Sequence, residues 1–536
     1  MLDLQNLLTL SGEWMLYSVA AAVGIGLSLL LVGVDAASVP KPSHGPQRFA
    51  GKCPKKQVIG HIAAFFLGLF GYALLLAVFN RFWTASVLGV LLIVLLWAGN
   101  RLKAAVLDEP LVFSDVFLAG HALRYPRLYF GYAPVWVWPM LAAALAGLGW
   151  LVGEEHALGL SVPVRFGILF TLIGIIWLLN EWSRIPNKSV DLFLKAHPLS
   201  FTANEDARRY TPIGAAFLHL MWHSRYRMQL RERFICQPME NSSSEGEPQC
   251  ACKTESPRHI MLIQAESFCP LAKKLKRPSN APFIDAQIEA GKGGDLELDW
   301  RGAYTMRSEF AVLTGLSLEA LETYGFDPYR LAAKEPMQSL ARVWGQKGYR
   351  TIVWHPNDGR FFDRNLVMPN LGFDEFWDLL RLQTEFGERL SKFGRYAADA
   401  SLLTLAAEFL KKQQCPTFLF IITMEAHGPW HADNFPGAER ITEVERYEAH
   451  LRSLDRGAAY IGREIEEGHL NAAVLMYGDH IPGIRELDVS PGKEADSASL
   501  TDTAWLLLGN ADAAALPQRT RPEELGELLV KAAKVV

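Results

Sequence analysis

The sequence is poor in cysteine and carries almost no net charge. Its 536 residues include six cysteines, and 53 Lys and Arg side chains nearly balance 57 Asp and Glu, for a formal charge of -4. Six cysteines in a chain of this length are too few for a disulfide scaffold. The mixed charges form no basic stripe of the kind that binds a phosphate backbone, so we predict no nucleic-acid partner.

Three of the cysteines lie close together in a Ser-, Glu- and Pro-rich stretch, at Cys236, Cys250 and Cys252. Local disulfides are one interpretation of this cluster. A zinc site at Cys250-x-Cys252 is a weaker one, because structural zinc pairs usually have two or more residues between their cysteines. The pairing stays open from the sequence.

Apolar residues are concentrated in the first 182 positions, in five continuous runs. Each run is close to the roughly 20 residues that a helix needs to cross a hydrocarbon core. The first run has no basic leader and no small-residue cleavage site, so we expect it to be retained rather than removed as a signal peptide. We predict an α-helical transmembrane domain at 1–182, with spans near 15–36, 58–79, 83–99, 134–153 and 164–182.

The segment between the third and fourth runs, residues 109–129, is apolar but interrupted by Asp115, His121, Arg124 and Arg127. This pattern favours an interfacial helix over a span. Periodicity alone supports a folded loop equally well.

Basic residues gather in the first and third loops, whereas the second loop offers only Arg81 and the fourth is acidic at Glu154 and Glu155. The positive-inside rule then places the first and third loops in the cytoplasm, and five spans place the C-terminal half there too. The basic residues are Lys41, Arg48, Lys52, Lys55 and Lys56 in the first loop, and Arg101, Lys103, Arg124 and Arg127 in the third.

From Pro257 onward, short β-rich runs alternate with helical patterns, which is typical of a mainly parallel sheet covered on both faces. We predict a linker with a Cys-containing insert at 183–256 and an α/β domain at 257–536. The predicted strands are His259–Gln264, Tyr349–Trp354, Thr417–Thr423, Ala472–Tyr477 and Ala504–Leu508, and the predicted helices are Met337–Gln346, Ala398–Lys411 and Val444–Glu467.

Polar side chains follow three of these strands, at Glu266, at Asp479-His480, and at Glu425-Ala-His427. Because the carboxyl ends of parallel strands share one edge of a sheet, we expect these side chains to converge there. Carboxylate oxygens favour Mg²⁺ or Mn²⁺, and a histidine nitrogen shifts the preference toward Mn²⁺ or Zn²⁺. Each motif alone is more often a loop element, but together they favour a metal site.

A fourth motif runs from Arg301 to Leu316, where a small-residue turn precedes a helical pattern and Thr305 lies at the helix start. One interpretation is an N-cap, with Ser308 or Glu309 completing a capping box. The other is a nucleophile, because a threonine hydroxyl that binds a cation has a lowered pKa and can attack phosphorus.

These four motifs together resemble the sulfatase and alkaline-phosphatase superfamily, and specifically its lipoteichoic acid synthase-like phosphoglycerol transferases, over residues 258 to about 510. The apolar half resembles the same family's membrane domain. The resemblance implies a sulfatase-like α/β/α sandwich in which one Mn²⁺ or Mg²⁺, with Zn²⁺ as an alternative, is bound by four residues. These are Glu266, Thr305, Asp479 and His480.

The resemblance also assigns the substrate side. The family's Thr-x-x-x-Glu-Phe pattern begins at Thr305, which favours Thr305 over Ser308 as the nucleophile. The substrate-side arginine matches Arg364 and the phosphate-side histidine matches His427. Phe362 stands where the family has a tryptophan, and His355 and Arg360 are nearby candidates for substrate binding.

The reaction that this resemblance implies begins when Thr305 attacks the phosphate of phosphatidylglycerol and releases diacylglycerol. The phosphoglycerol group then passes from Thr305 to an envelope glycan or a glycerophosphate acceptor. A phosphoethanolamine transferase and a non-catalytic membrane scaffold or sensor are the alternatives. A sulfatase is disfavoured, because the soluble half has no Cys/Ser-x-Pro-x-Arg motif.

Members of this family act at the bacterial inner (cytoplasmic) membrane, among membrane lipids, with the catalytic domain in the periplasm. The loop charges predict the opposite side. We expect the periplasmic side, because the envelope acceptor and oxidising conditions for the cysteines are found there.

Overall fold

The computed structural model describes residues 4–40, 54–117, 124, 137–184, 188–235, 258–271, 278–300, 304–430, 441–484, 502–509 and 516–534. The chain divides into two compact units, with the boundary between Met228 and Gln229. The Cys236, Cys250 and Cys252 cluster and most of the 109–129 segment lie outside the described residues. Among the other cysteines, Cys269 is a buried thiol, and Cys415 is disulfide-bonded.

The first unit contains one helix for each of the five apolar runs. Three of them are long and apolar enough to cross a membrane by length and composition, and the other two carry shorter apolar stretches. Helices α1, α2 and α3 pack together, while α7 packs against α2 and α6 against α3. The helices are α1 (Leu4–Ala37), α2 (Pro54–Phe79), α3 (Phe82–Leu107), α6 (Val137–Glu154) and α7 (Val162–Arg184).

Small residues let these helices approach closely. A Cβ atom added at Gly68 of α2 would lie 2.8 Å from the Cα atom of Ser28 on α1. Such contacts replace the hydrophobic effect, which is weak between helices in lipid. The turn between α2 and α3 is fixed by the α6–α7 connection, because the Glu155 carboxylate accepts hydrogen bonds from the backbone N–H groups of Trp83 (2.6 Å) and Thr84 (2.8 Å) at the start of α3.

Three further helices follow α7, and they lie near the end of α1 and the start of α2: α8 (Lys188–Ala196), α9 (Ala203–Tyr210) and α10 (Pro212–Phe234). Asp35, near the end of α1, accepts hydrogen bonds from the Ile213 N–H (2.9 Å) and the Thr211 hydroxyl, and so caps the start of α10. The Gln57 side chain donates to the Arg208 carbonyl (3.0 Å). Residues 188–228, which the sequence assigned to a linker, therefore belong to the helical unit.

The second unit is built on an eight-stranded sheet with the order β10-β2-β9-β8-β1-β7-β3-β4. All neighbouring strands are parallel except β9, which is antiparallel to both β2 and β8. The strands are β1 (His259–Ala265), β2 (Gly293–Leu296), β3 (Arg350–Trp354), β4 (Glu375–Trp377), β7 (Thr417–Ile422), β8 (Ala472–Gly478), β9 (Thr503–Leu508) and β10 (Arg519–Thr520). The five predicted strands and the mainly parallel sheet are confirmed.

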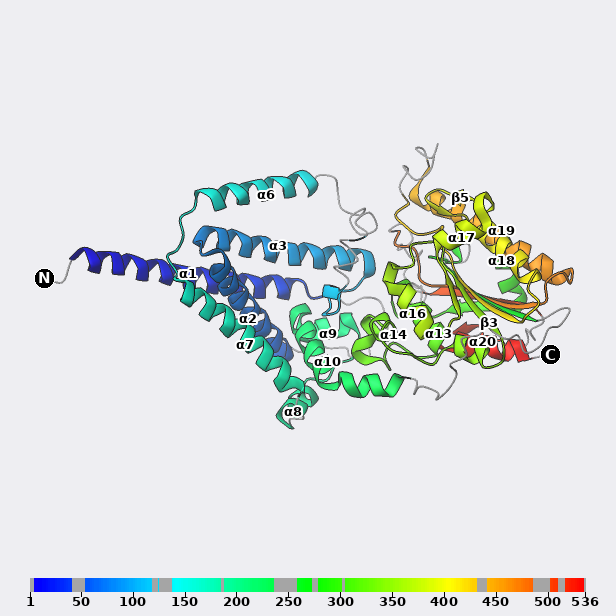
Figure 1. Ribbon diagram of the computed structural model, residues 1–536, viewed down its shortest axis with the longest axis horizontal. Coiled ribbons are helices and arrows are strands. Elements are labelled where there is room, and N and C mark those ends of the chain that lie inside the picture. The colour runs from blue at the N-terminus through cyan, green and yellow to red at the C-terminus, as the bar shows by residue number, and fades with distance from the viewer. Residues whose placement is uncertain are drawn as a thin grey trace. The chain divides into compact units, whose positions relative to one another are not determined.

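Helices cover both faces of this sheet, which confirms the predicted α/β/α sandwich. Figure 1 shows α18 (Asp399–Lys411) and α19 (Glu443–Glu466) on one face and α13 (Thr305–Thr314) and α20 (Pro522–Lys534) on the other. The helices bury every residue of β1, β7, β8 and β9, as expected for strands that are apolar on both faces.

Shorter elements complete the second unit. A two-stranded hairpin is formed by β5 (Lys392–Phe393) and β6 (Tyr396–Ala397), and leads directly into α18. The remaining helices are α12 (Pro282–Gln287), α14 (Tyr329–Ala332), α15 (Leu340–Gly345), α16 (Arg364–Asn370) and α17 (Leu379–Phe386).

Candidate active site

The polar residues that follow the central strands meet at one edge of the sheet. Strands β8, β1, β7 and β3 are neighbours and all run in the same direction, so their carboxyl ends lie side by side. The residues that follow them are Asp479 after β8, Glu266 after β1, Thr423 just after β7, and His355 after β3. This is the edge at which open α/β sheets bind ligands.

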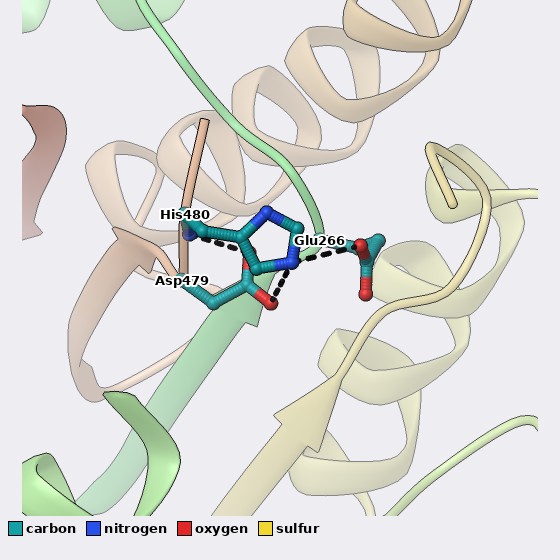
Figure 2. A group of neighbouring side chains, drawn as sticks. All are labelled: Glu266, Asp479 and His480. Atoms are coloured by element: carbon teal, nitrogen blue, oxygen red, sulfur yellow. Dashed lines mark hydrogen bonds and ion pairs between the residues drawn. The ribbon is translucent and has the colours of Figure 1, made fainter. Parts of the chain in front are cut away.

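Glu266, Asp479 and His480 form a compact cluster at this edge. Ala265 of β1 pairs with Gly478 of β8, so the next residues of the two strands are adjacent. Figure 2 shows the His480 imidazole directed at both carboxylates, with Nε2 3.5 Å from Glu266 Oε1 and 3.4 Å from Asp479 Oδ2. One candidate ligand atom from each residue lies within 4.8 Å of the others, and all three side chains are buried.

Hydrogen bonds hold one oxygen of each carboxylate and leave the other open. Asp479 Oδ1 accepts from the backbone N–H groups of Ser267 (2.8 Å) and His480 (2.9 Å), and Glu266 Oε1 accepts from the Ser267 hydroxyl (2.8 Å). Glu266 Oε2 and Asp479 Oδ2 have no hydrogen-bond partner within the described part of the chain. Because buried polar atoms are normally satisfied, these two oxygens need a partner that the described residues do not supply.

The electrostatics of the cluster point the same way. Burial raises the pKa of Asp479 to about 7, the nearby Glu266 carboxylate adds to this rise, and His480 opposes it. Burial disfavours the His480 imidazolium, but Asp479 and Glu266 outweigh it and raise its pKa. A buried excess of negative charge with two open carboxylate oxygens and an imidazole fits a divalent cation such as Mn²⁺, Mg²⁺ or Zn²⁺.

Thr305 lies beside this cluster as the first residue of α13. Its Oγ1 is 3.5 Å from His480 Nε2, and the proximity of the Thr305 side chain works to lower the pKa of the Asp479 carboxyl. The N-cap interpretation is wrong, because the N-cap position belongs to Tyr304 and no side chain caps the helix. Ser308 is directed elsewhere, since its hydroxyl donates to the Asp479 carbonyl.

Arg364, the predicted substrate-side arginine, is buried in an ion pair with Glu309. Its Nε donates to Glu309 Oε1 (3.2 Å) and its Nη2 to Oε2 (2.8 Å), and both side chains are almost fully inaccessible to solvent. Tyr329 donates its hydroxyl to the same carboxylate, and Gln264 donates its amide (3.2 Å). The glutamate of the Thr-x-x-x-Glu-Phe motif is therefore the counter-ion of the arginine.

His355 lies against the remaining side of this guanidinium. Arg364 Nη1 is 3.3 Å from His355 Nε2, and because arginine only donates, this nitrogen is the acceptor and the imidazole is neutral. Burial and the positive charge of Arg364 both lower the pKa of His355 well below its usual value. The ring of Phe362 lies 5.4 Å from the Arg364 guanidinium carbon, and Phe362 adopts a left-handed backbone (φ 56°).

His427 is half-buried in the loop after β7, with Nδ1 2.7 Å from the Gly428 carbonyl. A charge on His427 would influence the pKa of His355, and the charge of Glu266 influences the pKa of Arg364, so the arginine group and the Glu266, Asp479 and His480 cluster lie near each other. Arg360, in contrast, is exposed and paired with Asp358.

Several residues of this site carried no signal in the sequence. Tyr329 and Gln264 satisfy Glu309 from distant positions. Tyr396, in the β5–β6 hairpin, has its ring centre 5.9 Å from that of His427. Glu425, which the sequence did single out, accepts hydrogen bonds from the Asp399 N–H and the Ser453 hydroxyl, and so fastens the start of α18 beside the loop that carries His427.

Comparisons with known proteins agree with the fold of the second unit. A model of the sulfatase family matches residues 299–524. The capsular polysaccharide biosynthesis protein RkpI of Rhizobium meliloti (strain 1021) is 25% identical over 80% of this chain and 78% of its own length. Lipoteichoic acid synthase 1 of Bacillus subtilis (strain 168) is 27% identical over 31% of this chain and 26% of its own length.

Among solved structures, the full-length lipooligosaccharide phosphoethanolamine transferase A of Neisseria meningitidis matches with a TM-score of 0.52. The two chains are 13% identical, and the match covers 96% of this chain and 94% of the other. At this identity the likeness shows the fold alone, with apolar helices followed by a sulfatase-like domain.

The chain is thus a membrane protein whose residues 299–524 match the sulfatase family. Within the superfamily it is similar to the lipoteichoic acid synthases, as the motifs around Thr305 and Asp479 predicted.

Proposed function

We propose that this protein is a metal-dependent phosphoglycerol transferase that uses Thr305 as its nucleophile. The observation that carries the proposal is the position of the Thr305 hydroxyl, 3.5 Å from His480 and beside two buried carboxylates with open oxygens. The family supports phosphoryl transfer from a lipid donor as the general reaction. We assign the donor as phosphatidylglycerol and residues 257–536 as the catalytic domain.

In the first half-reaction, a bond forms between Thr305 Oγ1 and phosphorus while the bond from phosphorus to the diacylglycerol oxygen breaks. Glu309 accepts hydrogen bonds from Nε and from one hydrogen of Nη2 of Arg364, and His355 accepts one from Nη1. One hydrogen on each terminal nitrogen therefore remains to bind the phosphoryl oxygens. His427 donates the proton that the diacylglycerol oxygen needs to leave.

In the second half-reaction, the acceptor oxygen forms a bond to phosphorus, the bond from phosphorus to Thr305 Oγ1 breaks, and His427 takes the acceptor's proton. Thr305 thus leaves as the same alkoxide with which it begins the first half-reaction, so the protons balance. A divalent cation bound by Glu266, Asp479, His480 and Thr305 would lower the pKa of the threonine hydroxyl and neutralise phosphoryl charge. We propose Mn²⁺ or Mg²⁺, with Zn²⁺ as an alternative. The acceptor is an envelope glycan or a glycerophosphate chain, and the name of the Rhizobium relative supports the glycan.

We propose that the second unit faces the periplasm of the inner membrane. Cys415 is disulfide-bonded, and structural disulfides persist in oxidising compartments rather than in the cytoplasm. Labelling of an engineered surface cysteine in intact cells tests this. Reaction of that cysteine with a membrane-impermeant reagent supports the proposal, and protection of the cysteine until lysis contradicts it.

The function is tested by trapping the intermediate. Wild-type protein incubated with phosphatidylglycerol and Mn²⁺ should yield a peptide containing Thr305 with the added mass of glycerophosphate, and Thr305→Ala should yield none and should not release diacylglycerol. Ser308→Ala is the matched control, since its hydroxyl is bound to the Asp479 carbonyl, and it should keep the adduct. An adduct of phosphoethanolamine mass from phosphatidylethanolamine alone would replace the assigned donor, and no adduct with either lipid would favour a scaffold.

A further inference from the structure

The β5–β6 hairpin brings Tyr396 to the active site. Strand β6 runs into α18, and the start of α18 is fastened to the loop after β7 by the hydrogen bond from the Asp399 N–H to Glu425. His427 lies in the same loop, and the ring centres of Tyr396 and His427 are 5.9 Å apart. The position of Tyr396 is thus set by the same contacts that set the position of His427.

The hydroxyl of Tyr396 is shielded from solvent and has no hydrogen-bond partner among the residues that the structure describes. Burial raises the pKa of Tyr396 to about 12, with the Glu266 carboxylate adding to the rise and Arg395 opposing it. The phenol therefore keeps its proton at neutral pH. Among the described residues this donor has no acceptor.

Other buried tyrosines of the second unit differ in this respect. Tyr329 donates to Glu309, Tyr447 to the Ser267 carbonyl (2.6 Å), and Tyr477 to the Gln264 side chain. These three hydroxyls donate to other groups of the protein and so stabilise the fold. Tyr396 instead has its ring next to His427 and feels the charge of Glu266, so its free donor belongs to the reaction site.

We propose that the Tyr396 hydroxyl donates a hydrogen bond to a non-bridging oxygen of the phosphoryl group during its transfer to and from Thr305. Such an oxygen is negatively charged and only accepts hydrogen bonds, so it complements an unpartnered donor. Arg364 and His427 contact the phosphoryl group in the function proposed above, and Tyr396 adds a third contact. The inference rests on that proposed function, but it does not depend on whether the lipid headgroup is glycerol or ethanolamine.

The test compares Tyr396→Phe with the wild type and with Tyr349→Phe in the full-length protein. Tyr349 precedes β3 at the opposite edge of the sheet and packs on Trp344, so its hydroxyl is a matched control. Two quantities are measured: kcat/KM for phosphatidylglycerol turnover, and the inhibition constant of inorganic phosphate. Loss of a donor to a charged oxygen should lower kcat/KM by about 10- to 100-fold and weaken phosphate inhibition by at least about 10-fold.

Tyr349→Phe should stay within about twofold of the wild type in both measurements. If Tyr396→Phe also stays within about twofold in both, the inference is wrong. If Tyr396→Phe lowers the thermal midpoint, 3-fluorotyrosine at position 396 decides the matter, because it keeps the hydroxyl. Activity near wild type in that variant supports the hydrogen bond, and a loss equal to that of Tyr396→Phe overturns it.

Failure of the proposed function gives a different result. In that case the wild-type protein forms no adduct at Thr305 with phosphatidylglycerol. If phosphatidylethanolamine gives the adduct instead, the same three proteins are compared with that lipid, and the expected fold-changes are unchanged.

Discussion

Two groups of buried charge lie at the same edge of the sheet, and they differ in how their oxygens are satisfied. Both oxygens of Glu309 are bound, by Arg364, Tyr329 and Gln264. Glu266 and Asp479 each keep one buried oxygen without a hydrogen-bond partner in the described residues. The satisfied carboxylate holds the shape of the site, whereas the open ones are where the proposed cation would bind.

Asp479→Asn should break the open cluster and produce the largest effect. It removes one negative ligand, so we expect activity to fall by about 10³-fold or more. In the wild type, Mn²⁺ should raise the thermal midpoint because it binds only the folded protein, and Asp479→Asn should abolish that increase. Without metal, the variant should be at least as stable as the wild type, because one uncompensated buried charge is gone. A full Mn²⁺ response in the variant would contradict the assignment of Asp479 as a ligand.

Glu309→Gln should break the ion pair between Glu309 and Arg364. In contrast to Asp479→Asn, it should lower stability and leave the Mn²⁺ response intact. It leaves the Arg364 guanidinium buried without a counter-ion, so the free energy of unfolding should fall by about 3–5 kcal/mol, measured by denaturant titration. The activity that remains at low temperature should fall by about 10- to 100-fold, because Arg364 is no longer held in place. The Mn²⁺ response should persist.

Tyr329→Phe is the milder control for this pair. It removes one donor to Glu309 but keeps the ion pair, so the expected loss is about 1 kcal/mol with little change in activity. Equal losses in the two variants would show that the ion pair itself is unimportant.

An unpartnered atom also occurs far from the site, and it is predicted to affect acid stability but not activity. His259, at the start of β1, has a buried Nδ1 without a partner in the described chain, and burial lowers its pKa to about 4. The folded protein therefore binds fewer protons than the unfolded chain between about pH 6.5 and 4, and stability is lost as the pH falls through this window.

Acidification from pH 7 to 4.5 should cost the wild type about 2–3 kcal/mol through His259, and His259→Gln should be spared this part of the loss. Activity at pH 7 should be unchanged. Identical pH dependence of unfolding in the two proteins would mean that His259 does not control acid stability. His259 and Asp479 both have a buried polar atom without a hydrogen-bond partner in the described residues. Only at Asp479 do other candidate ligand atoms lie close by, so only there does such an atom point to a metal site.

The sequence predicts the central strands well but not the sheet edge beyond β9. Strands β1, β7, β8 and β9 are buried throughout and read as apolar runs. Strand β2 has the sequence Gly-Gly-Asp-Leu, which carries no such run, and its place depends on pairing with β9 and β10. Pairing between distant segments leaves no local pattern to read.

The residues of the candidate site also divide into those that the sequence predicts and those that it does not. Glu266, Asp479 and His480 follow strands, so the order of the strands brings them together. The partner of Arg364 is 55 residues away, and Tyr396 lies in a two-residue strand of a small hairpin. Whether a tyrosine hydroxyl is satisfied depends on the folded surroundings of its oxygen, which no sequence pattern reports.

The hydrogen bonds of Asp35 determine where the chain can be divided for expression. A soluble fragment that begins after α7 would carry α8, α9 and α10 without the carboxylate that caps α10 and without the α2 surface that α9 packs on. It would expose the apolar sides of these helices and tend to aggregate. A fragment that begins at Gln229 removes α8, α9 and most of α10 together with the helices they depend on.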